Sequence, residues 1–206
     1  MAGRPEAAAP SAASLHEPDR RAAEEPVRRS RRYDPNRRER LIATTLDVIA
    51  EHGIAGASHR AIARAADVPL GSTSYHFASI DDLLAAAFTV HAEHVAAALE
   101  HRMRAAEDKD AALEALTAHL SRDLLGAERA LVLAVELYVA AARRPALRTV
   151  TRAWMLRSRR ALELHFDAVT ARELDALIEG LVWHQWLSTD PMTDTQVRHA
   201  LYRITH

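Results

Sequence analysis

The sequence contains no cysteine and few residues that break helices. The absence of cysteine excludes a disulfide framework, a thiol nucleophile and a zinc site built on thiolates. Only six glycines and eight prolines occur in 206 residues, and five of the prolines lie before residue 36. Because strands need frequent turns and β-branched runs, the rest of the chain is a poor candidate for an all-β or doubly wound α/β fold. We therefore expect an all-α protein with a substantial core.

Long apolar segments are also missing. A helix that spans a bilayer needs roughly 18–20 consecutive apolar residues. The longest apolar run here extends from Ala130 to Ala142 and is interrupted by Glu136. The N-terminus lacks the compact apolar segment of a secretion signal. These absences predict a cytoplasmic protein with no membrane partner.

The positive charge of the chain is concentrated near its N-terminus, although the net charge is only −1. Residues 26–77 carry nine basic and five acidic side chains, whereas the segments on both sides carry an excess of acidic ones. Such a basic block is either the electrostatic footprint of a polyanion-binding surface or a solvated run of charge. Its main members are Arg28, Arg29, Arg31, Arg32, Arg37, Arg38 and Arg40.

The composition of the chain changes after residue 35. Residues 1–35 are rich in Ala, Pro, Arg and Glu and poor in large apolar side chains, so we expect them to form a disordered basic arm. Apolar residues at helical spacing begin in residues 36–80, which we expect to form a unit of three helices. Residues 81–206 are expected to form a larger helical bundle.

Capping residues and helix breakers predict where the helices begin and end. Gly53 is expected to close the first helix and Ser58 to cap the second. Pro69 suits the first turn of the third helix, and Ser79, followed by two aspartates, suits the start of a long fourth helix ending near Ala106. Further helices are expected at roughly 109–125, 127–143, 146–169, 171–188 and 194–205.

Residues 58–77, SHRAIARAADVPLGSTSYHF, have the pattern of a helix-turn-helix. The first short helix carries alanines that let a second helix approach closely, and Val68 is the apolar residue of the turn. The second helix carries short hydroxyl side chains, which can enter the major groove of DNA and reach phosphates and base edges. A packed helical hairpin with an incidental polar face is the alternative, but the adjacent basic block favours a helix-turn-helix.

Over residues 37–84 the sequence resembles the TetR family of transcriptional regulators. The resemblance implies an N-terminal three-helix helix-turn-helix DNA-binding domain at 36–80. It also implies a helical-bundle ligand-binding and dimerisation domain at 81–206. The matching features are Gly53, Ser58–Ala63, Val68–Phe77 and Ser79–Leu84, with Ile42, Ile62, Val68 and Phe77 expected in the core.

The resemblance also implies which residues contact DNA. Two positions depart from the family pattern, because Ile80 stands where members often have lysine and Ser74 where many have tyrosine. The basic arm could replace the lost phosphate contact by entering an adjacent minor groove. The expected DNA-binding residues are Ser58, His59, Arg60, Leu70, Gly71, Ser72, Ser74, Tyr75 and His76.

A single charged residue stands out in the C-terminal part. Glu136 is the one charge between Ala130 and Ala142, and a lone buried carboxylate needs a partner, a ligand or a raised pKa. Arg157 lies on the apolar face of the next helix, so we expect Glu136 and Arg157 either to pair or to face a shared cavity. The candidate ligand-binding residues are Phe88, His91, His94, His119, Glu136, Trp154, Arg157 and Trp183.

The histidines are a weaker indication of a site. His91 and His94 have a spacing at which two side chains can share a metal ion, but further ligands would be needed and cysteine is absent. A polar lining of a small-molecule pocket, or simple surface positions, explains them with fewer assumptions. We therefore expect neither a metal nor a cofactor.

The sequence thus predicts a ligand-responsive transcriptional regulator rather than an enzyme. The resemblance implies a repressor that binds a palindromic double-stranded DNA operator as a homodimer and is released by a small-molecule effector. The last two helices carry more apolar residues than one covering helix needs, which also favours a homodimer. The alternatives are a helical metal-dependent hydrolase using His91, His94 and Glu136, and a ligand-independent architectural DNA-binding protein.

Overall fold

The computed structural model describes residues 35–206, so the expected basic arm lies almost entirely outside the described residues. Within this range, α-helices and one π-helical turn follow one another without a strand, which confirms the all-α fold. No helix in residues 35–206 combines the length and apolar character that a membrane crossing requires. The elements are α1 (Arg37–Gly56), α2 (His59–Ala65), α3 (Leu70–His76), α4 (Ile80–Ala105), α5 (Lys109–Ala118), the π-helical turn η1 (His119–Leu124), α6 (Glu128–Ala141), α7 (Pro145–Leu162), α8 (Ala168–Leu187) and α9 (Asp194–Thr205).

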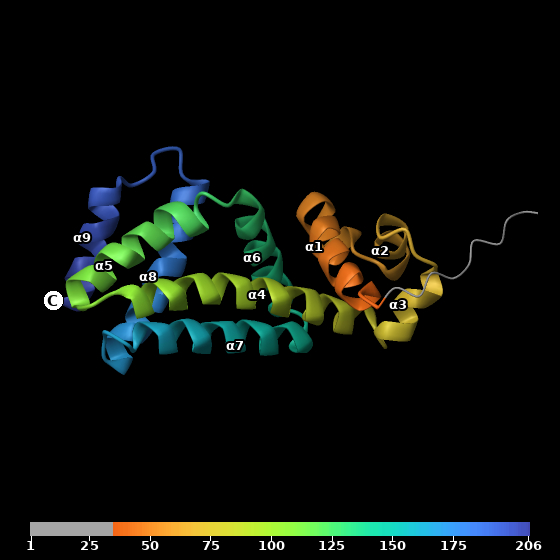
Figure 1. The fold of residues 1–206 in the computed structure, drawn as a ribbon. Coiled ribbons are helices and arrows are strands. Elements are labelled where there is room, and N and C mark those ends of the chain that lie inside the picture. Colours follow the sequence, from red (N-terminus) through yellow and green to blue (C-terminus); the bar gives the residue numbers. More distant parts are fainter. Residues whose placement is uncertain (1–34) are drawn as a thin grey trace, which may run out of the picture. The chain divides into compact units, whose positions relative to one another are not determined.

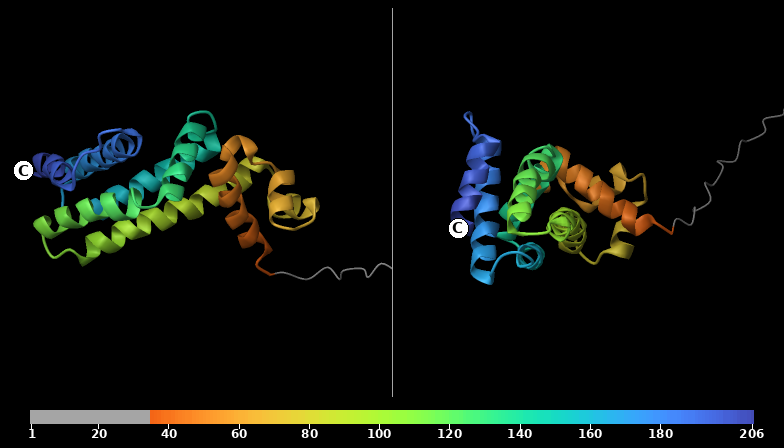
Figure 2. Two further views of the ribbon diagram at one scale, coloured as in Figure 1. Left: turned by 90° about the horizontal axis from the view of Figure 1, so that it is seen from above. Right: turned by 60° about the vertical axis from the view of Figure 1, so that its left-hand side comes forward.

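The long helix α4 runs through two apolar clusters (Figure 1). Its N-terminal half buries Leu84 and Phe88 against α1, α2, α6 and the start of α7. Its C-terminal half buries Leu99 and Met103 among α5, η1, α8 and α9. α4 also lies along α7, in the most extensive helix pair of the described residues. α4 therefore connects the N-terminal helices with the C-terminal ones, where α8 and α9 lie side by side (Figure 2).

Local capping explains several helix boundaries. The Ser58 hydroxyl oxygen accepts a hydrogen bond from the Ala61 N–H (3.2 Å), and the Ser79 hydroxyl oxygen accepts one from the Asp82 N–H (3.1 Å). Both serines are thus the predicted caps of α2 and α4. Pro69 stands immediately before α3 rather than in its first turn.

Two of the predicted helices are divided in the structure. The helix predicted at 146–169 ends at Leu162. The next helix, α8, begins where the Asp167 carboxylate accepts hydrogen bonds from the N–H groups of Val169 and Thr170. The range predicted as 109–125 changes at His119 into a π-helical turn. Neither break coincides with a glycine or proline, which are the breakers on which the predicted boundaries depended.

Gly53 bends α1 instead of ending it. The residue has φ +68° and ψ 171°, and the helix resumes as far as Gly56. Beside the bend, the Ile54 N–H donates a hydrogen bond of 2.8 Å to Oε2 of Glu136 on α6. A Cβ atom at position 53 would lie 3.1 Å from Oε1 of the same carboxylate. The bend therefore exposes one N–H group of α1 to α6, and a side chain at position 53 would crowd the Glu136 carboxylate.

Replacing the glycine tests this bend. Gly53→Ala should lower the free energy of unfolding by about 1–3 kcal/mol, because alanine is strained at positive φ and its methyl group crowds Glu136. Urea unfolding followed by circular dichroism measures the change. Gly71→Ala is the matched control, since a Cβ atom there meets nothing within 4 Å. Equal stability of the two variants would contradict the role of the bend.

His91 is a buried polar residue at the contact between α4 and α7. Its side chain meets Trp154 edge-on, with 5.8 Å between ring centroids, and its Nε2 atom has no hydrogen-bond partner. Burial, assisted by the nearby Arg129 and His94, lowers the pKa of His91 from 6.5 to about 4. The folded protein therefore holds this imidazole in its neutral form.

His91 should make the protein sensitive to mild acid. The unfolded chain protonates His91 below about pH 6.5, but the folded chain does so only near pH 4, so stability falls as the pH drops through this window. The loss attributable to His91 is at most about 3 kcal/mol. In His91→Phe, which keeps an aromatic ring against Trp154, the free energy of unfolding should depend less on pH between 6.5 and 4. His101→Gln, at an exposed position of α4, should retain the wild-type profile, and an unchanged profile in His91→Phe would disprove the assignment.

Candidate functional site

Helices α2 and α3 form the predicted helix-turn-helix. The turn between them is closed by a hydrogen bond of 3.0 Å from the Val68 N–H to the Ala63 carbonyl, and Asp67 adopts φ +51° within it. Thr73 is buried, and its hydroxyl donates to the Leu70 carbonyl at 2.7 Å, which fixes the first turn of α3 from inside. The turn therefore connects the two helices through a backbone hydrogen bond, and the buried hydroxyl is satisfied within α3 itself.

The core of this unit agrees with the sequence. Ile42, Ile62 and Phe77 are buried, and Val68 packs against the same apolar cluster. On the surface, the guanidinium carbon of Arg38 lies 5.3 Å from the centre of the Phe77 ring, which connects the basic start of α1 with the end of α3. The predicted core residues are therefore confirmed, and they leave the polar face of α3 outward.

The expected DNA-binding residues share one region of this unit. Three precede or begin α2, and the other six lie along α3. Tyr75 is the most prominent, because 84% of its side chain is exposed, and it contacts His76 edge-on. Ser58, Arg60, Leu70, Gly71, Ser74 and Tyr75 are exposed, and His59, Ser72 and His76 are half-buried.

A cavity of about 90 Å³ lies in the C-terminal part, where α4, η1, α6, α7 and α8 meet. Most of its wall is aliphatic, with leucine, valine, isoleucine and alanine side chains from four of these elements. The polar and aromatic residues of its wall are His119, Tyr138, Trp154, Ser158, Asp175, Glu179 and Trp183. A concave, largely apolar space with a few polar groups is typical of small-molecule sites.

Two carboxylates on α8 bring negative charge to this cavity. The Tyr138 hydroxyl donates to Oε1 of Glu179, and Arg159 Nε donates to Oδ2 of Asp175 at 2.8 Å. Burial raises the pKa of both Glu179 and Asp175, although the Tyr138 hydrogen bond and the Arg159 guanidinium act in the opposite direction. A cation in the cavity would therefore stabilise the ionised form of these carboxylates.

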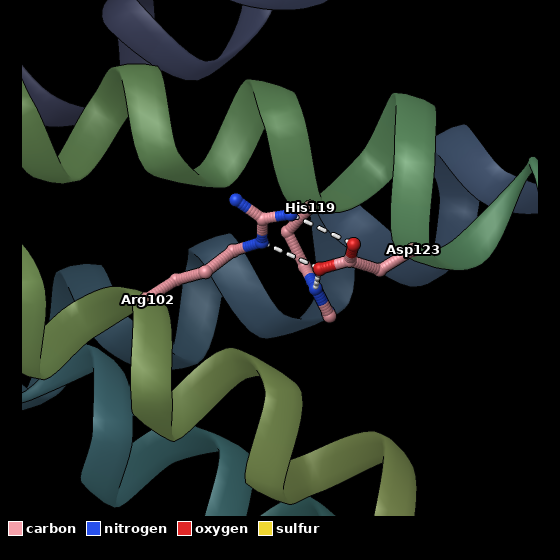
Figure 3. Close-up of polar contacts among 3 residues, drawn as sticks. All are labelled: Arg102, His119 and Asp123. Carbon is pink, nitrogen blue, oxygen red and sulfur yellow. Dashed lines mark hydrogen bonds and ion pairs between the residues drawn. The ribbon is translucent and has the colours of Figure 1, made fainter.

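Three charged or polar residues form a network at the η1 side of the cavity (Figure 3). Arg102 of α4 donates to both oxygens of Asp123, from Nε at 2.5 Å and from a terminal nitrogen at 2.7 Å. The Asp123 carboxylate also contacts Nδ1 of His119 at 2.9 Å. The hydrogen bond from Arg102 lowers the pKa of Asp123 to about 2, whereas burial lowers the pKa of His119.

The structure brings together only some of the candidate ligand-binding residues. His119, Trp154 and Trp183 line the cavity. Phe88 is fully buried in the apolar cluster around α1 and α4 and His91 lies behind Trp154, whereas His94 is exposed. These three residues, together with Glu136 and Arg157, are not part of the cavity wall.

The prediction that Glu136 and Arg157 pair or face a shared cavity is wrong, because each has another partner. Arg157 donates to both carboxylate oxygens of Glu100 on α4, at 2.6 and 3.0 Å. Glu136 accepts the Ile54 N–H of the bent helix α1. The carboxylate of Glu136 thus has a hydrogen-bond partner in the Ile54 N–H at the Gly53 bend. The sequence does not reveal this donor, because the bend must be known first.

Sequence reasoning missed the cavity residues Tyr138, Asp175 and Glu179. A signal was present for the two carboxylates, which stand four residues apart in a helix whose other members are largely apolar. Tyr138 lies within the apolar run from Ala130 to Ala142, where nothing in the sequence distinguishes it as a site residue. Across residues 35–206, no three His, Asp or Glu side chains gather where they could hold a metal ion.

Comparisons with known proteins agree with this architecture. The model of bacterial regulatory proteins of the tetR family matches residues 41–87, and the model of the tetracyclin repressor-like C-terminal domain matches residues 107–206. A search of curated proteins finds no match.

Several solved structures share sequence as well as fold. SCO7518 of Streptomyces coelicolor A3(2), assigned as a transcriptional regulator, is 50% identical over 83% of this chain and 99% of its own, with a TM-score of 0.81. The TetR-family member SCO1917 of Streptomyces coelicolor A3 is 37% identical over 84% of this chain and 99% of its own, with a TM-score of 0.73.

A third relative has been solved with small molecules. The multidrug binding protein EbrR, in complex with ethidium, is 37% identical over 82% of this chain and 99% of its own, with a TM-score of 0.75. EbrR has also been solved with proflavin and with malachite green. The helix-turn-helix, the helical domain that follows it and these matches show that the chain belongs to the TetR family of ligand-responsive, DNA-binding transcriptional regulators.

Proposed function

We propose that the protein is a repressor that binds a palindromic DNA operator as a homodimer and is released by an aromatic cation. The observation that carries this proposal is that the same two helices contact both the cavity and the DNA-binding unit. α4 and α6 line the cavity, and the same two helices contact α1, on which the helix-turn-helix is built. A ligand that displaces α4 or α6 therefore acts on the DNA-binding unit.

The DNA-binding surface in this proposal is the exposed face of α3 with the start of α2. Short side chains on α3 let the helix enter a major groove, where Tyr75 and His76 would reach phosphates or base edges. Arg60 at the start of α2 is exposed and supplies a positive charge next to them. The proposed domain boundary lies at Ser79, whose cap begins α4, so that residues 36–80 bind DNA and residues 81–206 bind the effector and the second subunit.

A homodimer supplies the second recognition helix that a palindromic operator requires. The predicted surplus of apolar residues is smaller than the sequence suggested, because most apolar residues of α8 and α9 are buried within the chain itself. Val169 and Leu187 on α8 and Tyr202 on α9 nevertheless expose half or more of their side chains. These residues are the proposed apolar contacts between two subunits.

The cavity favours an effector that is both aromatic and positively charged. Trp154, Trp183 and Tyr138 supply aromatic rings to the wall, and Asp175 and Glu179 supply carboxylates whose burial makes a cationic partner favourable. Proflavin, ethidium and malachite green, which EbrR binds, are aromatic cations. The likeness in ligand chemistry supports the same effector class for this chain.

The size of the cavity suggests how such an effector would act. Its volume of about 90 Å³ is below the 300–1,000 Å³ that drug-sized ligands usually occupy. An aromatic cation would therefore have to move parts of the wall outward, and α4 and α6 are two of the five elements that form it. An architectural DNA-binding protein, the ligand-independent alternative, would need neither the cavity nor its buried carboxylates.

Selection of bound sites from random DNA duplexes tests the DNA-binding proposal and supplies an operator for measurement. Arg60→Ala and Tyr75→Ala should each weaken operator binding by about 10–100-fold, because a lost base or phosphate contact costs about 1–3 kcal/mol. Fluorescence anisotropy at fixed salt measures the affinity. Arg152→Ala, which replaces an exposed arginine on α7, is the control and should keep the wild-type affinity. Full operator affinity in both alanine variants would refute the proposed surface.

Neutralising a cavity carboxylate tests the proposed effector class. Glu179→Gln should weaken proflavin binding by about tenfold, because the amide keeps the shape of the side chain but removes the charge that attracts the cation. Isothermal titration calorimetry measures the affinity, and release of proflavin-bound protein from its operator gives a second readout. Glu173→Gln, at an exposed position of the same helix, is the matched control. Equal proflavin binding by both variants would contradict a role for Glu179.

A further inference from the structure

The network of Arg102, Asp123 and His119 restricts the protonation of one cavity residue. Asp123 receives two hydrogen bonds from the Arg102 guanidinium, in the forked geometry that suits an ionised carboxylate (Figure 3). An ionised carboxylate can only accept hydrogen bonds. The contact of 2.9 Å between Asp123 Oδ2 and His119 Nδ1 therefore requires the proton to be on Nδ1.

The other ring nitrogen of His119 follows from this assignment. Only 3% of the residue is exposed, and burial lowers the pKa of the imidazole, so the ring is neutral at neutral pH. A neutral imidazole with a proton on Nδ1 carries a lone pair on Nε2. His119 lines the cavity and its Nδ1 is bound to Asp123, so Nε2 is the polar atom that His119 can offer to a ligand.

We propose that His119 is a fixed hydrogen-bond acceptor in the effector cavity, held by Asp123 and Arg102 so that Nε2 accepts from an N–H or O–H group of the bound molecule. This inference rests on the proposed function of the cavity and deepens it. Charge and stacking alone admit any aromatic cation, whereas an acceptor of fixed tautomer distinguishes cations that carry a hydrogen-bond donor from those that do not.

The network also connects the acceptor to α4. Asp123 is bound simultaneously by His119, which lines the cavity, and by Arg102, which belongs to α4. A ligand that pulls on the imidazole therefore acts, through a single carboxylate, on the helix that leads to the DNA-binding unit. Donor-bearing cations should for this reason release the operator more effectively than equally tight ligands without a donor.

The tautomer can be measured in the wild-type protein without any ligand. Long-range proton–nitrogen correlation NMR of ¹⁵N-histidine-labelled protein distinguishes the protonated ring nitrogen from the bare one, and loss of a signal in His119→Asn assigns it. The expected result at neutral pH is a proton on Nδ1 and a bare Nε2. A proton on Nε2, or a doubly protonated ring, would overturn the proposal. In Asp123→Asn, which removes the ionised acceptor, the preference for Nδ1 should weaken.

Three dyes test the acceptor function. Proflavin and ethidium carry amino N–H groups, whereas malachite green carries none. In His119→Asn the side-chain NH2 group can still donate to Asp123, but the shorter side chain places no acceptor at the position of Nε2. This variant should weaken binding of the first two dyes by about tenfold and leave malachite green within about twofold. His119→Phe, a second variant without an acceptor, should give the same pattern. His101→Asn, at an exposed position of α4 outside the cavity wall, is the control.

The outcomes separate this inference from the proposed function. An equal loss for all three dyes, or no loss for proflavin and ethidium, overturns the acceptor role of His119 but leaves the cationic effector class intact. If the wild-type protein binds none of the dyes, the proposed effector class is wrong. The tautomer seen by NMR then still decides for or against a fixed acceptor.

Discussion

The burial of α4 in two apolar clusters is the constraint on which the rest of the structure depends. One end of this helix supplies Leu84 and Phe88 to the cluster that holds α1 and α2, and the other supplies Leu99 and Met103 to the cluster around α8. Close packing of this kind is not continuously deformable. A displacement of α4 at the cavity is therefore carried along the helix as a rigid shift, rather than absorbed locally.

Ion pairs fix α4 at three places along its length. Near its start, Asp81 binds Arg144 at 2.7 Å, at the entry to α7. Farther along α4, Glu100 binds Arg157 of α7, and this hydrogen bond lowers the pKa of Glu100. One turn from the end, Arg102 binds Asp123 of η1. The first two pairs join α4 to α7 and the third joins it to η1, so α4 is tied to two of the other elements that line the cavity.

The features that sequence reasoning predicted well are local or follow from a short spaced pattern. The caps at Ser58 and Ser79 depend on residues three positions away, and the core positions Ile62 and Phe77 followed from the family resemblance of the helix-turn-helix segment. The family followed from the helix-turn-helix motif, and the fold class from it together with the scarcity of helix breakers. Apart from the scarcity of helix breakers, which is a property of the whole chain, each of these signals lies within a short segment.

The features that were missed depend on contacts between distant residues. Glu136 binds a backbone N–H that lies 82 residues away, and only the bend at Gly53 makes that N–H accessible. Arg157 binds Glu100, which lies 57 residues earlier in the chain, and only the contact between α4 and α7 brings these two side chains together. The cavity itself is a gap between five elements, and helical periodicity cannot reveal a gap.

Helix α6 explains why an effector in the cavity would reach the DNA-binding unit by a second route. Leu131, Ala134 and Tyr138 follow one another at spacings of three and four, so they occupy one face, and this face lines the cavity. Arg129 and Glu136 are seven residues apart and share another face, from which they bind Asp47 and the Ile54 N–H of α1. In the proposed mechanism, a ligand that pushes Tyr138 outward rotates or shifts α6 as a body. Because Glu136 of α6 accepts the Ile54 N–H of α1, such a shift of α6 must move α1 with it or break that hydrogen bond.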